Sequence, residues 1–215
     1  CHEPHQAPIA MIDKYADVFA KGWDQTRADR LARQIAMGIV PEDTVLPERN
    51  PMVNAWDDHS SDEQLLFTRL AAAYAAMLEH ADQHFGRVLD FLEESGQLDN
   101  TLVLVLSDNG ASQEGGPSGF VNAMGPYNMV KEDIADKVAR IDDIGGPDTH
   151  SNFPWGWAMA ANTPLKRYKQ NTHGGGIRDP LVICWPGVDD ASLRHGFCHA
   201  SDLTPTILDR LEKRG

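Results

Sequence analysis

Residues 101–110 read TLVLVLSDNG, in which six residues without a polar face are followed by an abrupt change to polar and Gly-rich sequence. A run that is apolar on both faces is typical of a strand covered on both sides, as in a parallel sheet. Open α/β sheets bind their ligands just beyond the carboxyl ends of the strands, where Asp108 and Asn109 would offer oxygen atoms. The same dipeptide is also an ordinary turn former, so a simple turn is the alternative.

A long helix is predicted directly before this strand. Ser60 and Glu63 form a capping-box pattern, and Gly96 predicts where the helix ends. Between these signals, apolar residues recur at helical spacing and predict a broad buried face, made by Leu66, Leu70, Tyr74, Met77, Ala81, Phe85, Val88 and Leu92. Helix, tight turn and buried strand together are half of a parallel βαβ unit.

Other parts of the chain carry weaker signals. A helix is predicted from an Asp24 cap to Gly38, and another begins at a Thr204 cap with Pro205 in its first position. A second buried strand is predicted at 181–185, with the sequence LVICW. Residues 112–162 are rich in Gly and Pro, and only 130–141 look helical; so long an irregular segment is more often functional than not.

Composition restricts the class of protein. A length of 215 residues suits one sizeable α/β domain or part of a larger one, and the first residue is Cys1 and not Met, as in a chain entered partway through. A net charge of −13 disfavours binding to nucleic acid or to an anionic membrane surface, and no segment is apolar for the roughly 20 residues of a membrane span. The three cysteines, Cys1, Cys184 and Cys198, form no CxxC pair, which favours a cytoplasmic location over a periplasmic one.

Several polar residues are candidates for chemistry. The carboxylate and amide oxygens of Asp108 and Asn109 would suit calcium or magnesium, although two ligands do not hold an ion. Lys169, close to the glycines at 174–176, could neutralise a sulfate or phosphate oxygen, or be a solvated surface lysine. His2 could act as a proton donor or ligand, or lie in a surface loop. The glycines could bring backbone close to a ligand or form a turn.

Two further sets of residues have both a functional and a structural interpretation. His80 and His84 stand four apart on the predicted long helix, a spacing that can bind zinc, but no third ligand stands at a suggestive distance and we assign them to the helix surface. Trp155 and Trp157 either line a pocket for an aromatic group or belong to the core.

Taken in order, these segments resemble the type I sulfatases, in particular the bacterial arylsulfatase branch of the alkaline-phosphatase-like superfamily. The resemblance covers essentially the whole chain and is carried by HEPHQAP at 2–8, SDNGAS at 107–112, TPLKRYKQNTHGGGIRDP at 163–180 and HASDLTPTIL at 199–208. It implies an α/β fold with a mixed, mostly parallel sheet between helices, incomplete in this chain. Residues 1–215 would then be a single partial catalytic domain.

The resemblance also implies roles for four residues. Asp108 and Asn109 match the pair that coordinates one divalent ion, usually calcium, with magnesium possible. Lys169 matches the lysine that holds a sulfate oxygen, and His2 matches the histidine that contacts the sulfate ester and is a proposed proton donor. The substrate would be a small sulfate ester. Relatives that hydrolyse phosphodiesters or phosphonates tend to carry Asp-His at the metal pair, which disfavours but does not eliminate that alternative.

One family motif has no counterpart here. The family's nucleophile is a formylglycine made from the Cys of a Cys-x-Pro/Ala-x-Arg motif, which implies a formylglycine-generating enzyme as partner. The nearest sequence begins at Cys184 and has Val188 where the motif needs Arg. We therefore expect the nucleophile in a missing N-terminal part, with the C-terminal end truncated as well, and expect residues 1–215 alone to be inactive. A non-catalytic calcium-binding remnant is the other alternative.

Overall fold

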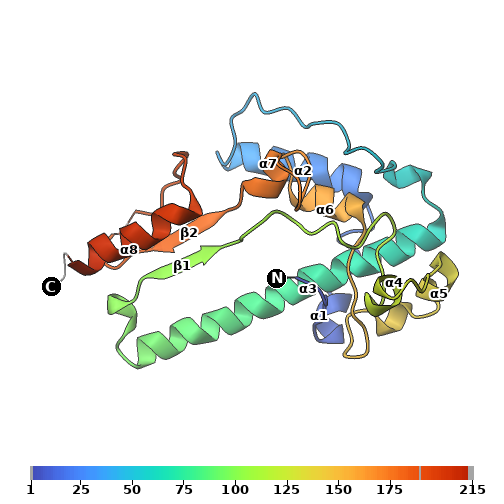
Figure 1. Ribbon diagram of the computed structural model, residues 1–215, viewed down its shortest axis with the longest axis horizontal. Coiled ribbons are helices and arrows are strands. Elements are labelled where there is room, and N and C mark those ends of the chain that lie inside the picture. Colours follow the sequence, from blue (N-terminus) through green and yellow to red (C-terminus); the bar gives the residue numbers. More distant parts are fainter. Residues whose placement is uncertain (1, 189, 213–215) are drawn as a thin grey trace.

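The structure, a computed structural model, describes residues 2–188 and 190–212, and most of its helices gather around one half of a long central helix (Figure 1). Its helices and strands are, in order, α1 (Ile9–Asp13), α2 (Gly22–Ala36), α3 (Ser61–Glu94), β1 (Val103–Leu106), α4 (Met124–Tyr127), α5 (Ile134–Val138), α6 (Trp155–Ala161), α7 (Gly174–Ile177), β2 (Leu181–Cys184) and α8 (Leu203–Glu212). Short 3-10 turns lie at Trp56–Asp58, Leu98–Asn100, Ile141–Asp143 and Ala200–Asp202.

The long helix α3 begins and ends where the sequence predicts. Ser60 Oγ accepts a hydrogen bond from the backbone N–H of Glu63, and the Glu63 carboxylate accepts one from the backbone N–H of Ser60 at 2.9 Å. Gly96 follows the helix with a φ of +67°, the left-handed conformation that glycine adopts without strain. The 34 residues of α3 correspond to a length of about 50 Å, so it spans much of the molecule.

Only the first half of α3 has the predicted buried face. Its buried side chains end at Ala76, and this half of the helix contacts α1 and α5, whereas Phe85 and Val88 are 38% and 53% exposed. The prediction of burial along the whole helix is therefore wrong for its second half. The reason is visible in Figure 1, where α3 runs on past the elements that cover its beginning. His80 and His84 lie on this part of the helix, with their Nε2 atoms 3.1 Å apart.

An aromatic core joins α2, α3 and α6. The ring of Trp23 lies 4.8 Å from that of Trp56 and 5.8 Å from those of Phe67 and Trp157, and Trp157 Nε1 donates a hydrogen bond to the Phe67 carbonyl. Gly156 is needed here, because a Cβ at this position would lie 2.4 Å from the Trp23 ring. Trp157 thus belongs to the core.

The two strands form an antiparallel pair in which Leu106 lies opposite Leu181 and Val103 opposite Cys184. Both predicted strands are confirmed in position. The prediction of a mostly parallel sheet is not confirmed, because the described residues contain this one two-stranded sheet. The chain leaves β1 and enters β2 at the same end, which makes the pair antiparallel. The predictions that β1 and β2 are buried strands are wrong, since Val105 and Leu106 are 44% and 47% exposed and Val182 is 61% exposed.

Three helix predictions need correction. α2 begins at Gly22, before the predicted Asp24 cap, because the Asp24 carboxylate instead accepts a hydrogen bond from the Trp56 backbone N–H at 2.9 Å. α8 begins at Leu203 and continues a 3-10 turn, so Thr204 does not cap it. Of the helix predicted at 130–141, five residues form α5, with Asp133 as its cap.

Two general findings concern the described residues as a whole. No helix there combines the length and the apolar character that a membrane span requires. Cys184 and Cys198 are free and exposed, while Cys1 lies outside the described residues.

Candidate functional site

The predicted metal pair lies where β1 ends. Asp108 is exposed and Asn109 is half-buried, and Ser107 Oγ closes a local turn by donating a hydrogen bond to the Asn109 carbonyl at 2.8 Å. The backbone bends here, in agreement with the turn interpretation. The Asp108 carboxylate lies at the surface and not in the protein core.

Asp179 stands opposite this pair. If the register of β1 and β2 is continued by two residues beyond Leu106 and Leu181, Asp108 lies opposite Asp179. Partial burial and the negative charge of Asp108 raise the pKa of Asp179, which agrees with their proximity. The carboxylates of Asp108 and Asp179 are therefore close enough to interact electrostatically at this end of the sheet. The sequence analysis missed Asp179, because its place opposite Asp108 depends on the antiparallel pairing of the strands.

Glycines allow the loop that contains Asp108 and Asn109 to pack against the segment that carries Lys169. The Gly110 backbone N–H donates to the Gly176 carbonyl, and a Cβ at Gly110 would lie 1.7 Å from the Gly175 carbonyl oxygen. A Cβ at Gly175 would lie 2.1 Å from the Arg167 carbonyl oxygen. The glycines at 174–176 therefore allow two segments of the chain to pack closely against each other. The sequence analysis considered only a contact with a ligand or a turn at this place.

Asn162 holds the same three segments together. Its Oδ1 accepts a hydrogen bond from the Ala111 backbone N–H at 3.0 Å, and its Nδ2 donates to the carbonyls of Arg167 and Gly175 at 3.1 and 2.8 Å. One amide group thus fixes the loop after Asn109, the loop before Lys169 and the glycine turn. The sequence analysis did not identify it.

Lys169 extends from this junction toward the N-terminal segment. Its backbone N–H donates to the Ala111 carbonyl at 3.1 Å, which places it beside the loop that follows the metal pair. Its ammonium lies 3.0 Å from His2 Nε2 and 3.0 Å from Glu114 Oε1. With 23% of its side chain exposed, Lys169 is not the solvated surface lysine that its basic neighbours suggested.

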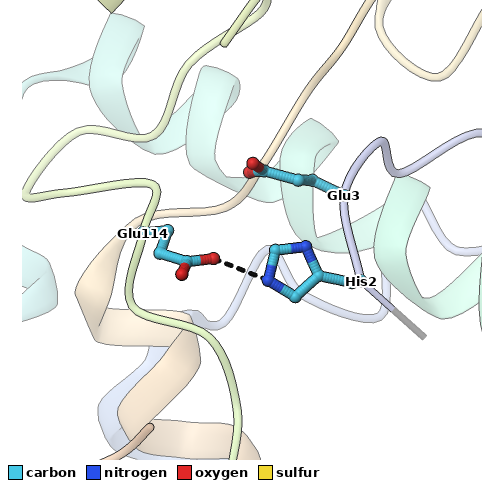
Figure 2. A group of neighbouring side chains, drawn as sticks. All are labelled: His2, Glu3 and Glu114. Carbon is cyan, nitrogen blue, oxygen red and sulfur yellow. Dashed lines mark ion pairs between the residues drawn. The ribbon is translucent and has the colours of Figure 1, made fainter. Parts of the chain in front are cut away.

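His2 completes the group. Its Nε2 lies 2.6 Å from Glu114 Oε2, and Figure 2 shows the ring turned toward that carboxylate, while the neighbouring Glu3 approaches from another direction. Partial burial of Glu114 opposes its ionisation, but hydrogen bonds from Lys169 and Ser112 and the positive charges nearby outweigh burial and lower the pKa of the carboxyl. The structure thus brings His2 and Lys169 together around a carboxylate that the sequence analysis did not identify.

Glu3 anchors the segment that carries His2. Its carboxylate accepts hydrogen bonds from the Tyr127 hydroxyl at 3.0 Å and from Asn152 Nδ2 at 2.8 Å. His5, two residues after Glu3, is buried between the rings of Tyr74 and Phe153, with its backbone N–H bonded to the Ser151 carbonyl. His2 is exposed and lies in a segment without helix or strand, as expected for a surface loop, and this segment is anchored after His2 by Glu3 and His5.

A cavity of about 400 Å³ has a lining that includes Trp23, His59, Trp155 and Pro117, and none of His2, Glu114 and Lys169 belongs to that lining. Trp155 also supports the loop that carries Glu114, because its backbone N–H donates to the Gly116 carbonyl and its Nε1 to the Gln113 carbonyl. Trp155 thus lines a cavity, whereas Trp157 does not.

Comparison with known proteins gives a consistent result. The sequence model of the family described as Sulfatase matches residues 1–213. An uncharacterized sulfatase of Schizosaccharomyces pombe is 32% identical over 98% of this chain and 37% of its own length. An arylsulfatase of Klebsiella aerogenes is 28% identical over 97% of this chain and 43% of its own length. An N-acetylgalactosamine-6-sulfatase of Rattus norvegicus is 27% identical over 69% of this chain. The chain spans about two fifths of the length of the first two relatives.

Proposed function

The chain belongs to the sulfatase family, and on that basis we propose that the protein hydrolyses sulfate monoesters to inorganic sulfate and an alcohol or phenol. The observation that carries the proposal is the contact between Lys169 Nζ and His2 Nε2 at 3.0 Å. A fixed cation and a group able to donate a proton lie side by side, as this reaction requires. We favour an arylsulfatase over other sulfatases because the similarity to the Klebsiella aerogenes arylsulfatase spans nearly the whole chain.

Hydrolysis of a sulfate monoester sets two electrostatic demands. The sulfuryl oxygens remain negative throughout, and the departing oxygen gains negative charge as its bond to sulfur breaks. A positioned cation stabilises the first, and a proton donor relieves the second. Lys169 meets the first demand: an ammonium has three N–H donors, and one of them is directed at Glu114, which leaves N–H donors for a sulfuryl oxygen.

His2 meets the second demand. An imidazole is the side chain whose ordinary pKa lies nearest neutrality, which suits it to proton transfer at physiological pH. Its ring is held against Lys169 and Glu114, so a substrate whose sulfate contacts the ammonium would place its ester oxygen near the same ring. We assign to His2 the donation of a proton to the departing alkoxide or phenoxide.

The residues at the end of β1 fit a hard divalent cation. Asp108, Asn109 and Asp179 offer carboxylate and amide oxygens, the ligands that calcium and, with stricter geometry, magnesium prefer. We propose that Asp108 and Asn109 hold calcium, with magnesium as a substitute, and that the ion, when bound, adds positive charge against the sulfuryl oxygens. The contribution of the chain is to fix this loop to the Lys169 segment through Gly110 and Asn162.

The nucleophile is proposed to come from outside residues 1–215. These residues contain no Cys-x-Pro/Ala-x-Arg motif: Cys184, within β2, and Cys198 each begin a partial match, in which Val188 and Asp202 stand where the motif needs Arg. We propose a formylglycine, made by a formylglycine-generating enzyme, as the group that supplies nucleophilic attack at sulfur. The polypeptide 1–215 alone is then expected to show no turnover.

The test uses the protein as its gene encodes it, produced together with a formylglycine-generating enzyme. Hydrolysis of 4-nitrophenyl sulfate is compared with hydrolysis of bis(4-nitrophenyl) phosphate at equal concentrations with added calcium. We expect the sulfate ester to have the larger kcat/KM. A larger value for the phosphodiester would replace this proposal with a phosphodiesterase, and the lack of both activities would favour a non-catalytic protein.

A further inference from the structure

The pair formed by Lys169 and His2 raises an electrostatic difficulty. The two nitrogen atoms lie 3.0 Å apart, and both side chains can carry positive charge. At that distance two cations repel each other strongly in a partly buried site. Their backbones belong to segments 167 residues apart, so the pair has no local structure to hold it. Some other group must keep both side chains in this arrangement.

Glu114 is placed to do so. Its Oε1 lies 3.0 Å from Lys169 Nζ and its Oε2 lies 2.6 Å from His2 Nε2, so the two carboxylate oxygens are shared between the two bases. Ser112 Oγ donates a further hydrogen bond to Oε2 at 2.9 Å. Figure 2 shows the carboxylate aimed at the His2 ring. One negative charge thus offsets the repulsion and sets the position of both nitrogen atoms.

The loop that carries Glu114 is itself held rigidly. Trp155 donates hydrogen bonds from its backbone N–H to the Gly116 carbonyl at 2.8 Å and from Nε1 to the Gln113 carbonyl at 2.7 Å. A Cβ at Gly115 would lie 2.0 Å from the Phe153 carbonyl oxygen, so this residue packs directly against backbone. The carboxylate therefore extends from a loop fixed on both sides, as a group that positions others must.

A metal site is a poorer interpretation of the same residues. Ligand atoms of His2, Glu3 and Glu114 do lie within 4.8 Å of one another. The Glu3 oxygens, however, already accept hydrogen bonds from Tyr127 and Asn152. The Glu114 oxygens are taken by Lys169, His2 and Ser112. An ion would have to displace the cation of Lys169 from its carboxylate partner.

We propose that Glu114 is a positioning residue for sulfate ester hydrolysis, holding the Lys169 ammonium against the sulfuryl oxygens and the His2 ring at the leaving-group oxygen. This inference rests on the proposed function. Glu114 itself makes no contact with substrate in this scheme, and it acts through the two side chains that do. Removal of the Glu114 carboxylate should therefore impair both the binding of the sulfuryl oxygens by Lys169 and the proton donation by His2. The loss of activity should be larger for substrates that depend more on proton donation.

The test compares Glu114→Gln, Glu114→Asp and the control Glu79→Gln in the protein as its gene encodes it. Glu79 is a matched control, because its side chain is 23% exposed against 22% for Glu114 and it likewise bonds a lysine and a second side chain, Lys14 and Tyr15. Each variant is assayed on 4-nitrophenyl sulfate and on an unactivated alkyl sulfate, with the folded fraction measured by circular dichroism.

For Glu114→Gln we expect kcat/KM for the aryl ester to fall about 10- to 100-fold, the scale of a small misplacement of catalytic groups. The loss should be about 10-fold larger for the alkyl sulfate, because a poor leaving group depends more on a proton donor. Glu114→Asp, which keeps the charge, should recover part of the loss, and Glu79→Gln should retain wild-type kcat/KM on both esters.

Three results would overturn the inference. Equal losses on both esters would remove the link to His2, and unchanged kcat/KM with a lowered thermal midpoint would make Glu114 purely structural. A gain in kcat/KM would show that the carboxylate competes with substrate for Lys169. If the wild type hydrolyses neither ester, the proposed function fails. In that case the ¹⁵N chemical shifts of the His2 ring still test the contact, because they should change in Glu114→Gln and stay unchanged in Glu79→Gln.

Discussion

Lys169 Nζ and His2 Nε2 lie 3.0 Å apart although 167 residues separate them in the chain. Lys169 reaches this place from a loop pinned to the end of β1, and His2 from a segment anchored through Glu3 and His5. The contact therefore depends on the packing of three separate segments.

Replacement of Lys169 by Met should lower kcat/KM for 4-nitrophenyl sulfate by about 100- to 1,000-fold, because it removes the positioned cation for the sulfuryl oxygens. Steady-state kinetics on the protein as its gene encodes it provide the measurement. Lys14→Met is the control, since Lys14 forms an ion pair with Glu79 on the surface of α1 and α3. Similar losses in both variants would show that the effect of Lys169 is general destabilisation.

Replacement of Asn162 by Ala should lower the free energy of unfolding by about 2 kcal/mol, since it leaves the Ala111 N–H and two carbonyls without their side-chain partner. Chemical denaturation measures the change. Asn128→Ala is the control, because the Asn128 side chain makes a single local hydrogen bond to the Met124 carbonyl at an exposed site. If both variants have the same stability, Asn162 does not hold the three segments together.

His5 should make stability depend on pH in the acidic range. Burial, together with the positive charges of His2 and His150, lowers the pKa of His5 to about 3. The unfolded state, with an ordinary pKa near 6.5, then binds a proton that the folded state does not. This contribution to stability is complete above pH 6.5 and is lost as pH falls toward 3, by about 1.4 kcal/mol per pH unit.

The measurement is the difference in unfolding free energy between the wild type and His5→Phe from pH 7 to pH 4. Phe keeps a ring between Tyr74 and Phe153 but does not titrate. The wild type should lose stability more steeply than this variant as pH falls. His84→Ala, at an exposed position on α3, should follow the wild-type curve. Parallel curves for the wild type and His5→Phe would contradict the prediction.

Calcium should stabilise the protein as its gene encodes it, with Asp108 as one of the ligands. With free calcium at about 100 times its dissociation constant, one site adds roughly 2.7 kcal/mol to the free energy of unfolding. Thermal unfolding with calcium and with a chelator measures this shift. Asp108→Ala should remove it, and Asp82→Ala, at an exposed position of α3, should leave it intact. A shift that survives in Asp108→Ala would place the ion elsewhere.

Replacement by Ala should lower the stability of the protein at one glycine and raise it at another. At Gly156 the new Cβ would meet the Trp23 ring at 2.4 Å, and such overpacking should cost about 1–3 kcal/mol. At Gly86, inside α3, nothing lies within 4 Å of the new Cβ, and the variant should gain up to about 1 kcal/mol from helix propensity. Thermal denaturation of both variants tests the prediction, and a neutral Gly156→Ala would show that the aromatic core yields easily.

Sequence patterns located the elements that local interactions determine. The limits of α3 follow from Ser60, Glu63 and Gly96, all of which act within a few residues of the helix ends. The strands β1 and β2 were found as apolar runs, but their antiparallel pairing depends on how residues 107–180 return to the end of β1. No local pattern encodes that return. The irregular segment 112–162 hid short helices, such as α4 and α6, which have too few turns to show a period.

Some residues of the candidate site could likewise be predicted from the sequence, and others could not. Asp108 and Asn109 were suggested by their place after a strand, while the roles of Lys169 and His2 came from resemblance to a family. Glu114 could not be identified, because its contact with His2 spans 112 positions of the sequence and nothing near Glu114 indicates it. These assignments to chemistry stay predictions until the experiments above are done.

The pairing of Leu106 with Leu181 has a consequence for how this protein can vary in evolution. Each strand residue adds about 3.4 Å and reverses the side-chain direction, so one inserted residue between Leu106 and Asp108 would shift the carboxylate and turn it to the opposite face. Insertions and deletions should therefore be rare there and between Asp179 and Leu181. They should accumulate in the exposed loop at 190–198, where length sets no spacing between functional groups.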